Sequence, residues 1–138
     1  MNVNIEPTTQ RKIDNFNKAL AALNRFMLEP NRSEATAAGI IKGFEFTFEQ
    51  TWKLFQHLAD LAGMQTASPK AALRAALKLG LIDDEKLWLD MLVDRNLSSH
   101  TYHTSLAEEL VERIESSYSK ELQAVASRVQ SHLRDDKC

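Results

Sequence analysis

Eight consecutive residues, RNLSSHTY at positions 95–102, carry most of the side chains in this chain that could do chemistry. They include the guanidinium of Arg95, the amide of Asn96, the imidazole of His100 and the phenol of Tyr102. Histidine carries protons near neutral pH, and the arginine fork binds phosphate oxygens. Such a set suits RNA cleavage without a metal, which must deprotonate a 2′-hydroxyl, stabilise a phosphorane and protonate a leaving oxygen.

Helical geometry divides these side chains between two faces. Arg95 and Tyr102 are seven residues apart and share a face with Ser99 between them, while Asn96 and His100 share the neighbouring face. On an ideal helix Arg95 and His100 point roughly 140° apart. Both can reach one substrate only if the helix loosens here or if a second copy of the chain completes the site. The hydroxyl side chains of the segment favour loosening, because they offer the backbone alternative hydrogen bonds.

The same residues also have a purely structural interpretation. Arg95 could pair with Asp94, Asp90 or Glu49, and His100 could cap the end of a helix, where positive charge is favoured. A pattern this short occurs by chance in many proteins, so its composition alone does not decide between the two interpretations.

Other constellations are weaker. Glu45 and Glu49 are four residues apart on one face of an expected helix, where they are either solvated or face Arg95 and tether it. His100 and His103 have helical spacing for a metal, but no third ligand is evident, so we expect no metal site. The chain has no glycine-rich phosphate loop, and we expect no cofactor.

The elements that position these residues are predicted to be helices. Only four Gly and three Pro occur in the chain, and apolar residues recur at steps of three and four. We expect helices over residues 9–28, 33–62 and 69–80, a fourth from Asp83 and a fifth from Thr104 or Ser105. This order predicts an all-α fold, an up-and-down four-helix bundle with one short extra helix. It is a single domain over residues 1–138, with a core at about 9–133 and a frayed tail at 134–138.

Capping residues and apolar stripes support these bounds. Asn31 or Ser33 can cap the second helix, Gly63 stands where a left-handed cap would end it, and Ser68 with Pro69 begins the third. The fifth helix carries a stripe of Leu106, Leu110, Ile114, Tyr118 (or Ser117), Leu122 (or Glu121), Val125 and Val129.

The second helix is rich in aromatic residues. Phe44, Phe48 and Phe55 fit a core stripe, whereas Phe46 lies well off it. Phe46 either packs against another helix of the same chain or belongs to a dimer face, because aromatic residues are enriched at the cores of interfaces.

Composition limits the class of protein. The chain of 138 residues is 43% hydrophobic and 26% charged, which is ordinary for a globular domain. No apolar run reaches the ~18 residues that a membrane span needs, and we expect no export signal because residues 1–10 lack an apolar core. The lone Cys138 cannot form an intramolecular disulfide, which fits the cytoplasm. The net charge of −2 argues against a general nucleic-acid coat but leaves room for a local RNA site.

The chain resembles a known superfamily. Arg95-x4-His100-x-Tyr102 resembles the R-x(4–6)-H motif of HEPN proteins, in the form found in HepT-type toxins. Further segments resemble the nucleotidyltransferase substrate-binding protein family within it: GFEFTFE at 43–49, WK at 52–53, SPK at 68–70 and WLDM at 88–91. The resemblance spans about residues 13–122, and this ordered set is far more specific than the short motif.

This resemblance implies a homodimeric helical bundle whose partner is a minimal nucleotidyltransferase (MNT) encoded beside it. Arg95 and His100 would form a metal-independent ribonuclease site acting on RNA, supported by Asn96. From their positions on the expected helices, Glu45, Glu49 and Ser99 are further candidates for support. Tyr102 would accept AMP from ATP, and the added phosphate would silence the toxin. The alternative within the family is a non-catalytic substrate-binding subunit of a two-component nucleotidyltransferase.

Overall fold

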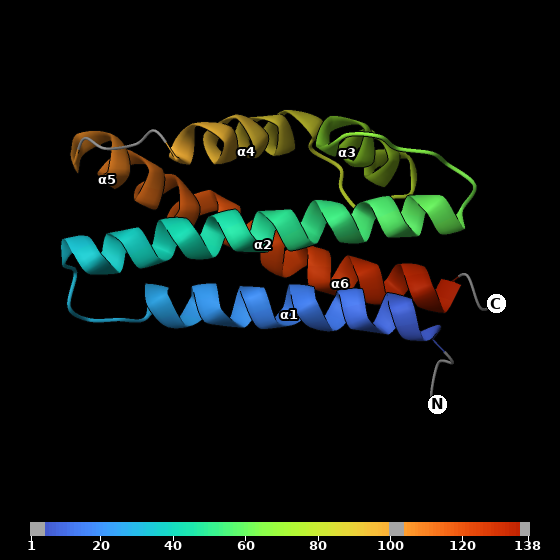
Figure 1. Ribbon diagram of the computed structural model, residues 1–138, viewed down its shortest axis with the longest axis horizontal. Helices are drawn as coiled ribbons and strands as arrows, with labels where there is room; N and C mark the ends of the chain where they lie inside the picture. Colours follow the sequence, from blue (N-terminus) through green and yellow to red (C-terminus); the bar gives the residue numbers. More distant parts are fainter. Residues whose placement is uncertain (1–4, 100–103, 136–138) are drawn as a thin grey trace.

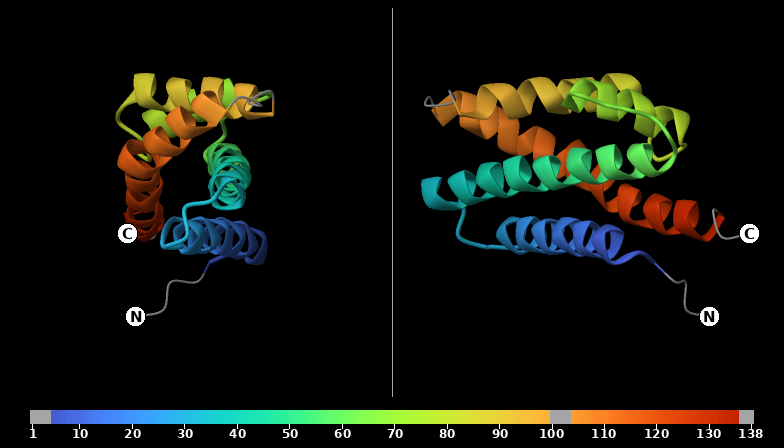
Figure 2. Two further views of the ribbon diagram at one scale, coloured as in Figure 1. Left: turned by 90° about the vertical axis from the view of Figure 1, so that its left-hand side faces the viewer. Right: turned by 45° about the vertical axis from the view of Figure 1, so that its right-hand side comes forward.

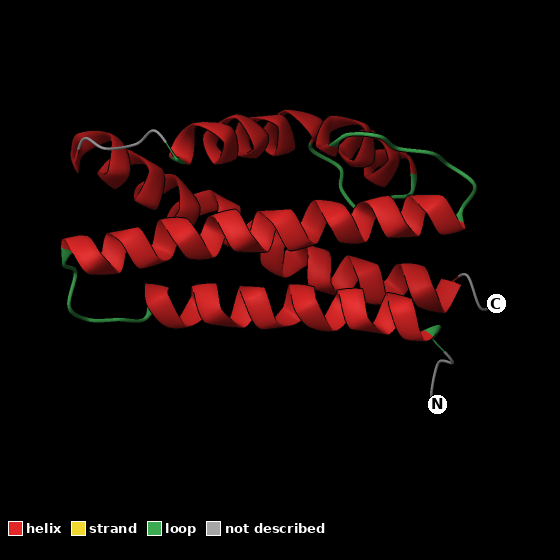
Figure 3. Ribbon diagram, viewed as in Figure 1, coloured by secondary structure: helices red, strands yellow, loops and turns green. Residues whose placement is uncertain are grey.

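The computed structural model describes residues 5–99 and 104–135, and this part of the chain is helical without any strand (Figure 3). The elements are α1 (Pro7–Met27), α2 (Glu34–Leu61), α3 (Pro69–Lys78), α4 (Glu85–Ser98), α5 (Thr104–Arg113), a π-helical segment η1 (Ile114–Tyr118) and α6 (Ser119–Asp135). Because α5, η1 and α6 follow one another directly, they form one long bent helix. The predicted all-α class, with four long helices and one short one, is confirmed.

The long helices alternate in direction. Figure 1 shows α1 and α2 running antiparallel, α4 returning above α2, and the α5–α6 helix running back along the bundle. The short α3 packs between the C-terminal half of α2 and the start of α4. Seen from the end in Figure 2, α1, α2, α4 and the α5–α6 helix surround a common interior. This is the up-and-down order that the sequence predicts.

Side-chain caps explain where the helices begin. The hydroxyl oxygen of Ser33 accepts from the amide of Thr36 at 3.2 Å, and that of Ser68 accepts from the amide of Ala71 at 3.1 Å. Both predicted caps are therefore confirmed. Gly63, at φ +83°, is the left-handed residue that follows α2, as expected.

Two helix starts differ from the prediction. α1 begins at Pro7 rather than residue 9, because the carboxylate of Glu6 caps it by accepting from the amide of Thr8 at 3.1 Å. α4 is capped by Asp84 rather than Asp83: the Asp84 carboxylate accepts from the amide of Leu87 at 3.1 Å. Neighbouring acids give the same sequence signal, and only the backbone conformation decides between them.

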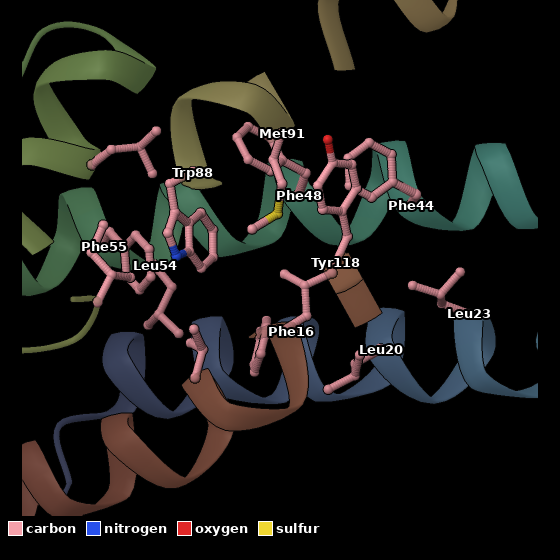
Figure 4. Close-up of a cluster of buried hydrophobic side chains, with 14 of the residues drawn as sticks. Phe16, Leu20, Leu23, Phe44, Phe48, Leu54, Phe55, Trp88, Met91 and Tyr118 are labelled. Carbon is pink, nitrogen blue, oxygen red and sulfur yellow. The ribbon is translucent and has the colours of Figure 1, made fainter. Parts of the chain in front are cut away.

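The core is aromatic and lies between the four long helices (Figure 4). Phe44 stacks on Tyr118 with ring centroids 5.4 Å apart, and Phe55 meets Trp88 edge-on at 5.4 Å. The predicted stripe of the last helix is buried from Leu110 onward. Leu106 is 48% exposed, so the buried stripe begins one turn later than predicted.

Candidate active site at the end of helix α4

Helix α4 directs Arg95 toward the interior of the bundle. Trp88 and Met91 precede it by seven and four residues, so they lie about 20° and 40° to either side of Arg95 around the helix. Trp88 and Met91 are fully buried and hold that face against the core. The side chain of Arg95 retains 27% exposure, because it extends from the same face at the last turn of the helix.

Glu49 of α2 holds Arg95 from across the bundle. Nη2 of Arg95 lies 3.1 Å from Oε1 of Glu49, and the other carboxylate oxygen accepts from the indole nitrogen of Trp52 at 3.2 Å. Of the three acids considered as partners for Arg95, Glu49 is therefore the one in contact. Asp94 and Asp90 pair instead with Arg113 at 2.8 Å and Lys86 at 2.9 Å.

Arg95 also keeps an unused donor. Its Nε is buried and has no hydrogen-bond partner among the described residues. A buried donor without a partner costs free energy, on the order of 1–3 kcal/mol, and such groups are rare in folded proteins.

The other residues expected to support Arg95 do not hold it in place. Glu45 lies 3.6 Å from Lys42 on its own helix, so the structure brings Glu49 but not Glu45 to Arg95. Asn96 and Ser99 are both exposed, and their side chains form no hydrogen bond with another described residue. They are available to a substrate or partner but do not hold Arg95.

Helix α4 ends within the motif, at Ser98. The hydroxyl of Ser98 donates to the carbonyl of Arg95 at 2.8 Å, and α4 ends at Ser98 with Ser99 as its C-cap. Side-chain bonds of this kind compete with the helical pattern, as the sequence predicted. His100, Thr101, Tyr102 and His103 lie outside the described residues, so the predicted roles of His100 and Tyr102 rest on the sequence.

A second polar cluster fixes the other flank of α4. Arg113 donates to both carboxylate oxygens of Asp94, at 2.8 and 3.1 Å, and the phenol of Tyr118 donates to Asp94 at 2.5 Å. Burial and this hydrogen bond raise the pKa of Tyr118 well above its ordinary value. The hydrogen bond to Asp94 likewise raises the pKa of Arg113. The cluster ties the residue before Arg95 to the π-helical segment.

The contacts of Asp94 with Arg113 and Tyr118 were not predicted from the sequence. One sequence pattern nevertheless indicates the π-helical segment. Leu110, Ile114, Tyr118 and Leu122 are all buried at steps of four. On an ideal α-helix each such step drifts by about 40°, which would rotate the stripe off the core. The wider turn over Ile114–Tyr118 absorbs the drift and directs Tyr118 toward Asp94. π-Helical turns occur frequently at functional sites.

Neither a metal cluster nor a membrane span is found in the described residues, 5–99 and 104–135. They contain no group of three or more His, Cys, Asp or Glu side chains placed to hold a metal ion. Within the same residues, no helix has the length and apolar character to cross a membrane.

Comparison with known families shows to which family the chain belongs. Residues 11–131 match the family described as nucleotidyltransferase substrate binding protein like. The chain belongs to this family. The match covers both Glu49 and the whole 95–102 segment, and it confirms the resemblance read from the sequence.

Individual relatives extend the comparison. A probable ribonuclease HepT of Haemophilus influenzae is 29% identical over 108 residues, 74% of each chain. A solved protein of Thermus thermophilus is 35% identical, with a TM-score of 0.74 over 82% of this chain and 97% of its own.

Two toxin–antitoxin structures share the fold at 11% identity and a TM-score of 0.75. One is a MntA–HepT complex, matched over 91% of this chain and 99% of its own. The other is a tri-AMPylated HEPN toxin of Shewanella oneidensis with its MNT antitoxin, matched over 92% and 99%. The fold of this chain is therefore that of the HEPN toxins in such pairs.

Proposed function

We propose that this protein is a HEPN-type endoribonuclease that cleaves RNA without a metal ion and is silenced when a partner nucleotidyltransferase transfers AMP to Tyr102. One observation supports the proposal most strongly: Glu49 fixes Arg95 at the end of α4 while the Nε of Arg95 stays buried without a partner among the described residues. The residue is thus held in position with a donor unused, five residues before His100 and seven before Tyr102.

The proposed chemistry uses two copies of the motif. The imidazole of one His100 takes the proton of a 2′-hydroxyl, whose oxygen then attacks the adjacent phosphorus. The bond from phosphorus to the 5′-oxygen breaks, and the protonated His100 of the second copy gives that oxygen its proton. Arg95 donates to the phosphate oxygens as their charge grows, and Asn96 orients the phosphate. The products are a 2′,3′-cyclic phosphate and a free 5′-hydroxyl.

The role of Glu49 in this chemistry is to position Arg95. Its contact uses one terminal nitrogen of the guanidinium, Nη2, and leaves the other terminal nitrogen for phosphate. The hydrogen bond from Trp52 holds the Glu49 carboxylate in turn. A guanidinium held from one side loses less rotamer entropy when the phosphate binds.

Silencing follows from charge. The phenol oxygen of Tyr102 attacks the α-phosphorus of ATP, pyrophosphate leaves, and the phenol proton is released. The new phosphodiester is an anion close in sequence to Arg95 and His100, and it occupies the place of an RNA phosphate. An AMPylated HEPN toxin among the related structures supports this step for the family fold.

A two-fold dimer completes the proposed site. Phe46 is 55% exposed, so the interpretation that it packs within its own chain is wrong. It lies three residues before Glu49 on α2. Val93 and Leu97, on the outer side of α4, are also exposed, at 54% and 56%. We propose that a second copy of this chain covers Phe46 and brings two motifs together.

Cleavage of a labelled RNA in the presence of a chelator tests the ribonuclease assignment. The wild-type dimer should cleave, and the variants His100→Ala and Arg95→Ala should not. An exposed carboxylate of α1 far from the motif in sequence, changed in Asp14→Asn, provides the control and should leave cleavage intact. Equal cleavage by wild type and His100→Ala would remove the catalytic role of His100.

The second candidate function is a non-catalytic subunit that presents a substrate to the nucleotidyltransferase. The family description, which names substrate binding rather than cleavage, favours it. Expression of the chain alone in cells discriminates between the two: a ribonuclease toxin arrests growth, whereas a binding subunit is harmless at the same level of expression. The Arg95→Ala variant, expressed equally well, should be harmless under both.

A further inference from the structure

Two surface hollows adjoin each other beside the C-terminal half of α2. The first, of about 330 Å³, lies between α1 and α2 and includes Lys12, Lys53 and His57 in its lining. The second, of about 370 Å³, lies against α3 and includes Lys70, Arg74 and Lys78. Both are also lined by Gln65 and Thr66 of the α2–α3 connection, so they form one continuous depression.

This depression concentrates positive charge in an acidic chain. Two lysines line the first hollow, and two lysines and an arginine line the second, which makes five cations against one acid, Asp60. The whole chain carries 17 Lys and Arg against 19 Asp and Glu. The surplus of positive charge is therefore confined to this depression. We call the surface that it forms the α2–α3 basic surface; it consists of Lys12, Lys53, Lys70, Arg74 and Lys78.

Most of these cations are not neutralised within the chain. Lys12, Lys70 and Lys78 have no carboxylate within 4.0 Å among the described residues. Lys53 and Arg74 each have one, at 3.9 Å, and their side chains are 50% and 61% exposed. Contacts that long and exposed are weak, and they leave both groups able to bind an anion.

The spacing of the α3 cations argues against an ordinary solvated face. Lys70, Arg74 and Lys78 follow one another at four-residue steps, so like charges lie side by side along a helix of ten residues. Adjacent like charges destabilise a helix, and a solvated face usually mixes both signs. An anionic ligand that lies along the helix offsets the repulsion between these cations.

The surface also connects to the candidate active site. Lys53 lies one turn beyond Glu49 on α2, and its ammonium is 3.9 Å from the Glu49 carboxylate that holds Arg95. Lys53 lines the first hollow, and Gln65 and Thr66 join that hollow to the one against α3. A polyanion bound at Arg95 therefore meets further cations on its way along α2.

We propose that the α2–α3 basic surface binds the phosphate backbone of the RNA that flanks the cleaved bond. The inference rests on the proposed ribonuclease function and adds where the substrate lies. Long, exposed ammonium and guanidinium groups give phosphate contacts without base specificity. The Nε2 of His57 is engaged within the chain, 2.7 Å from the hydroxyl of Thr9 and 3.7 Å from the carboxylate of Glu6.

RNA binding by the full chain tests the proposal. The probe is a labelled, single-stranded 2′-O-methyl RNA of mixed sequence, which lacks the attacking hydroxyl and so stays intact. The test variant is Lys70→Gln/Arg74→Gln/Lys78→Gln. The control, Lys18→Gln/Arg25→Gln/Lys120→Gln, removes the same charge at exposed positions outside the two hollows. Glutamine is a good helix former, and helix content by circular dichroism verifies folding of both.

Removal of three phosphate contacts should weaken binding at least tenfold and reduce the slope of log K against log salt by about 2. The control should retain the wild-type slope. Equal loss in both variants, or unchanged binding in the α3 variant, would overturn the proposal. So would unchanged RNA binding together with lost binding of the partner nucleotidyltransferase, because the surface would then serve a protein. Wild-type binding with the expected slope but no cleavage of natural RNA would instead remove the ribonuclease function and leave the surface.

Discussion

Glu49 and Arg95 join α2 to the last turn of α4 through a contact of 3.1 Å between Oε1 and Nη2. Both side chains are about 30% exposed, so the pair is neither a surface ion pair nor a buried one. Its contribution to stability is accordingly modest, about 1 kcal/mol. The larger consequence is geometric, since the pair fixes where the guanidinium lies relative to the segment that follows α4.

Removal of this tether should affect catalysis more than stability. We expect Glu49→Ala to lower kcat for RNA cleavage by about ten- to a hundredfold, because a misplaced arginine stabilises the transition state poorly. Glu49→Gln keeps a hydrogen-bond acceptor for Arg95 and should lose less. Steady-state cleavage kinetics and urea unfolding on the same samples separate the two effects. A loss of activity that only parallels loss of folded protein would contradict a positioning role.

Tyr118 should contribute measurably to the stability of the bundle. Tyr118→Phe keeps the ring stacked on Phe44 but removes the hydrogen bond to Asp94. Since Asp94 remains bound by Arg113, we expect a loss of about 1–2 kcal/mol in the free energy of unfolding. Urea unfolding monitored by circular dichroism measures it. The corresponding loss should not appear in a Ser116→Ala control, where the hydroxyl is exposed on the same segment.

The same tyrosine should make stability depend on alkaline pH. Its pKa in the folded protein is raised above the ordinary value of 10.0. Above pH 10 the unfolded chain therefore releases this proton while the folded chain retains it, so stability is lost as pH rises. The slope should approach about 1.4 kcal/mol per pH unit. The free energy of unfolding of wild type and Tyr118→Phe, measured between pH 9 and 11, tests this. If it falls equally steeply with pH in both proteins, Tyr118 is not the group responsible.

Phe46 should control the oligomeric state. A charge placed there by Phe46→Glu would be buried in the proposed interface, so the variant should dissociate into folded monomers. Leu28→Glu changes an apolar residue that is 81% exposed at the end of α1 and should leave the dimer intact. Sedimentation velocity measures both. A wild-type protein that is monomeric at all concentrations would contradict the two-copy site.

Local features of the sequence predicted much of the fold. Ser33, Ser68 and Gly63 act through their own backbone neighbours, so their roles can be read from a few residues. Glu49 could be named as a partner of Arg95, but only as one of three acids. The contact of Asp94 with Arg113 and Tyr118 could not be read, because it joins residues 19 and 24 positions apart and depends on the π-helical turn. Local propensity carries no information on such pairs.

The most direct test of the account couples modification to activity. The purified protein is incubated with the neighbouring nucleotidyltransferase and ATP, its intact mass is recorded, a chelator is added, and cleavage of a labelled RNA is followed. We predict that the untreated protein cleaves, and that the treated protein gains the mass of AMP and does not. Tyr102→Phe should gain no mass and remain active after treatment. An untreated protein that never cleaves RNA, or a modified one that cleaves as well as the untreated, would contradict the account.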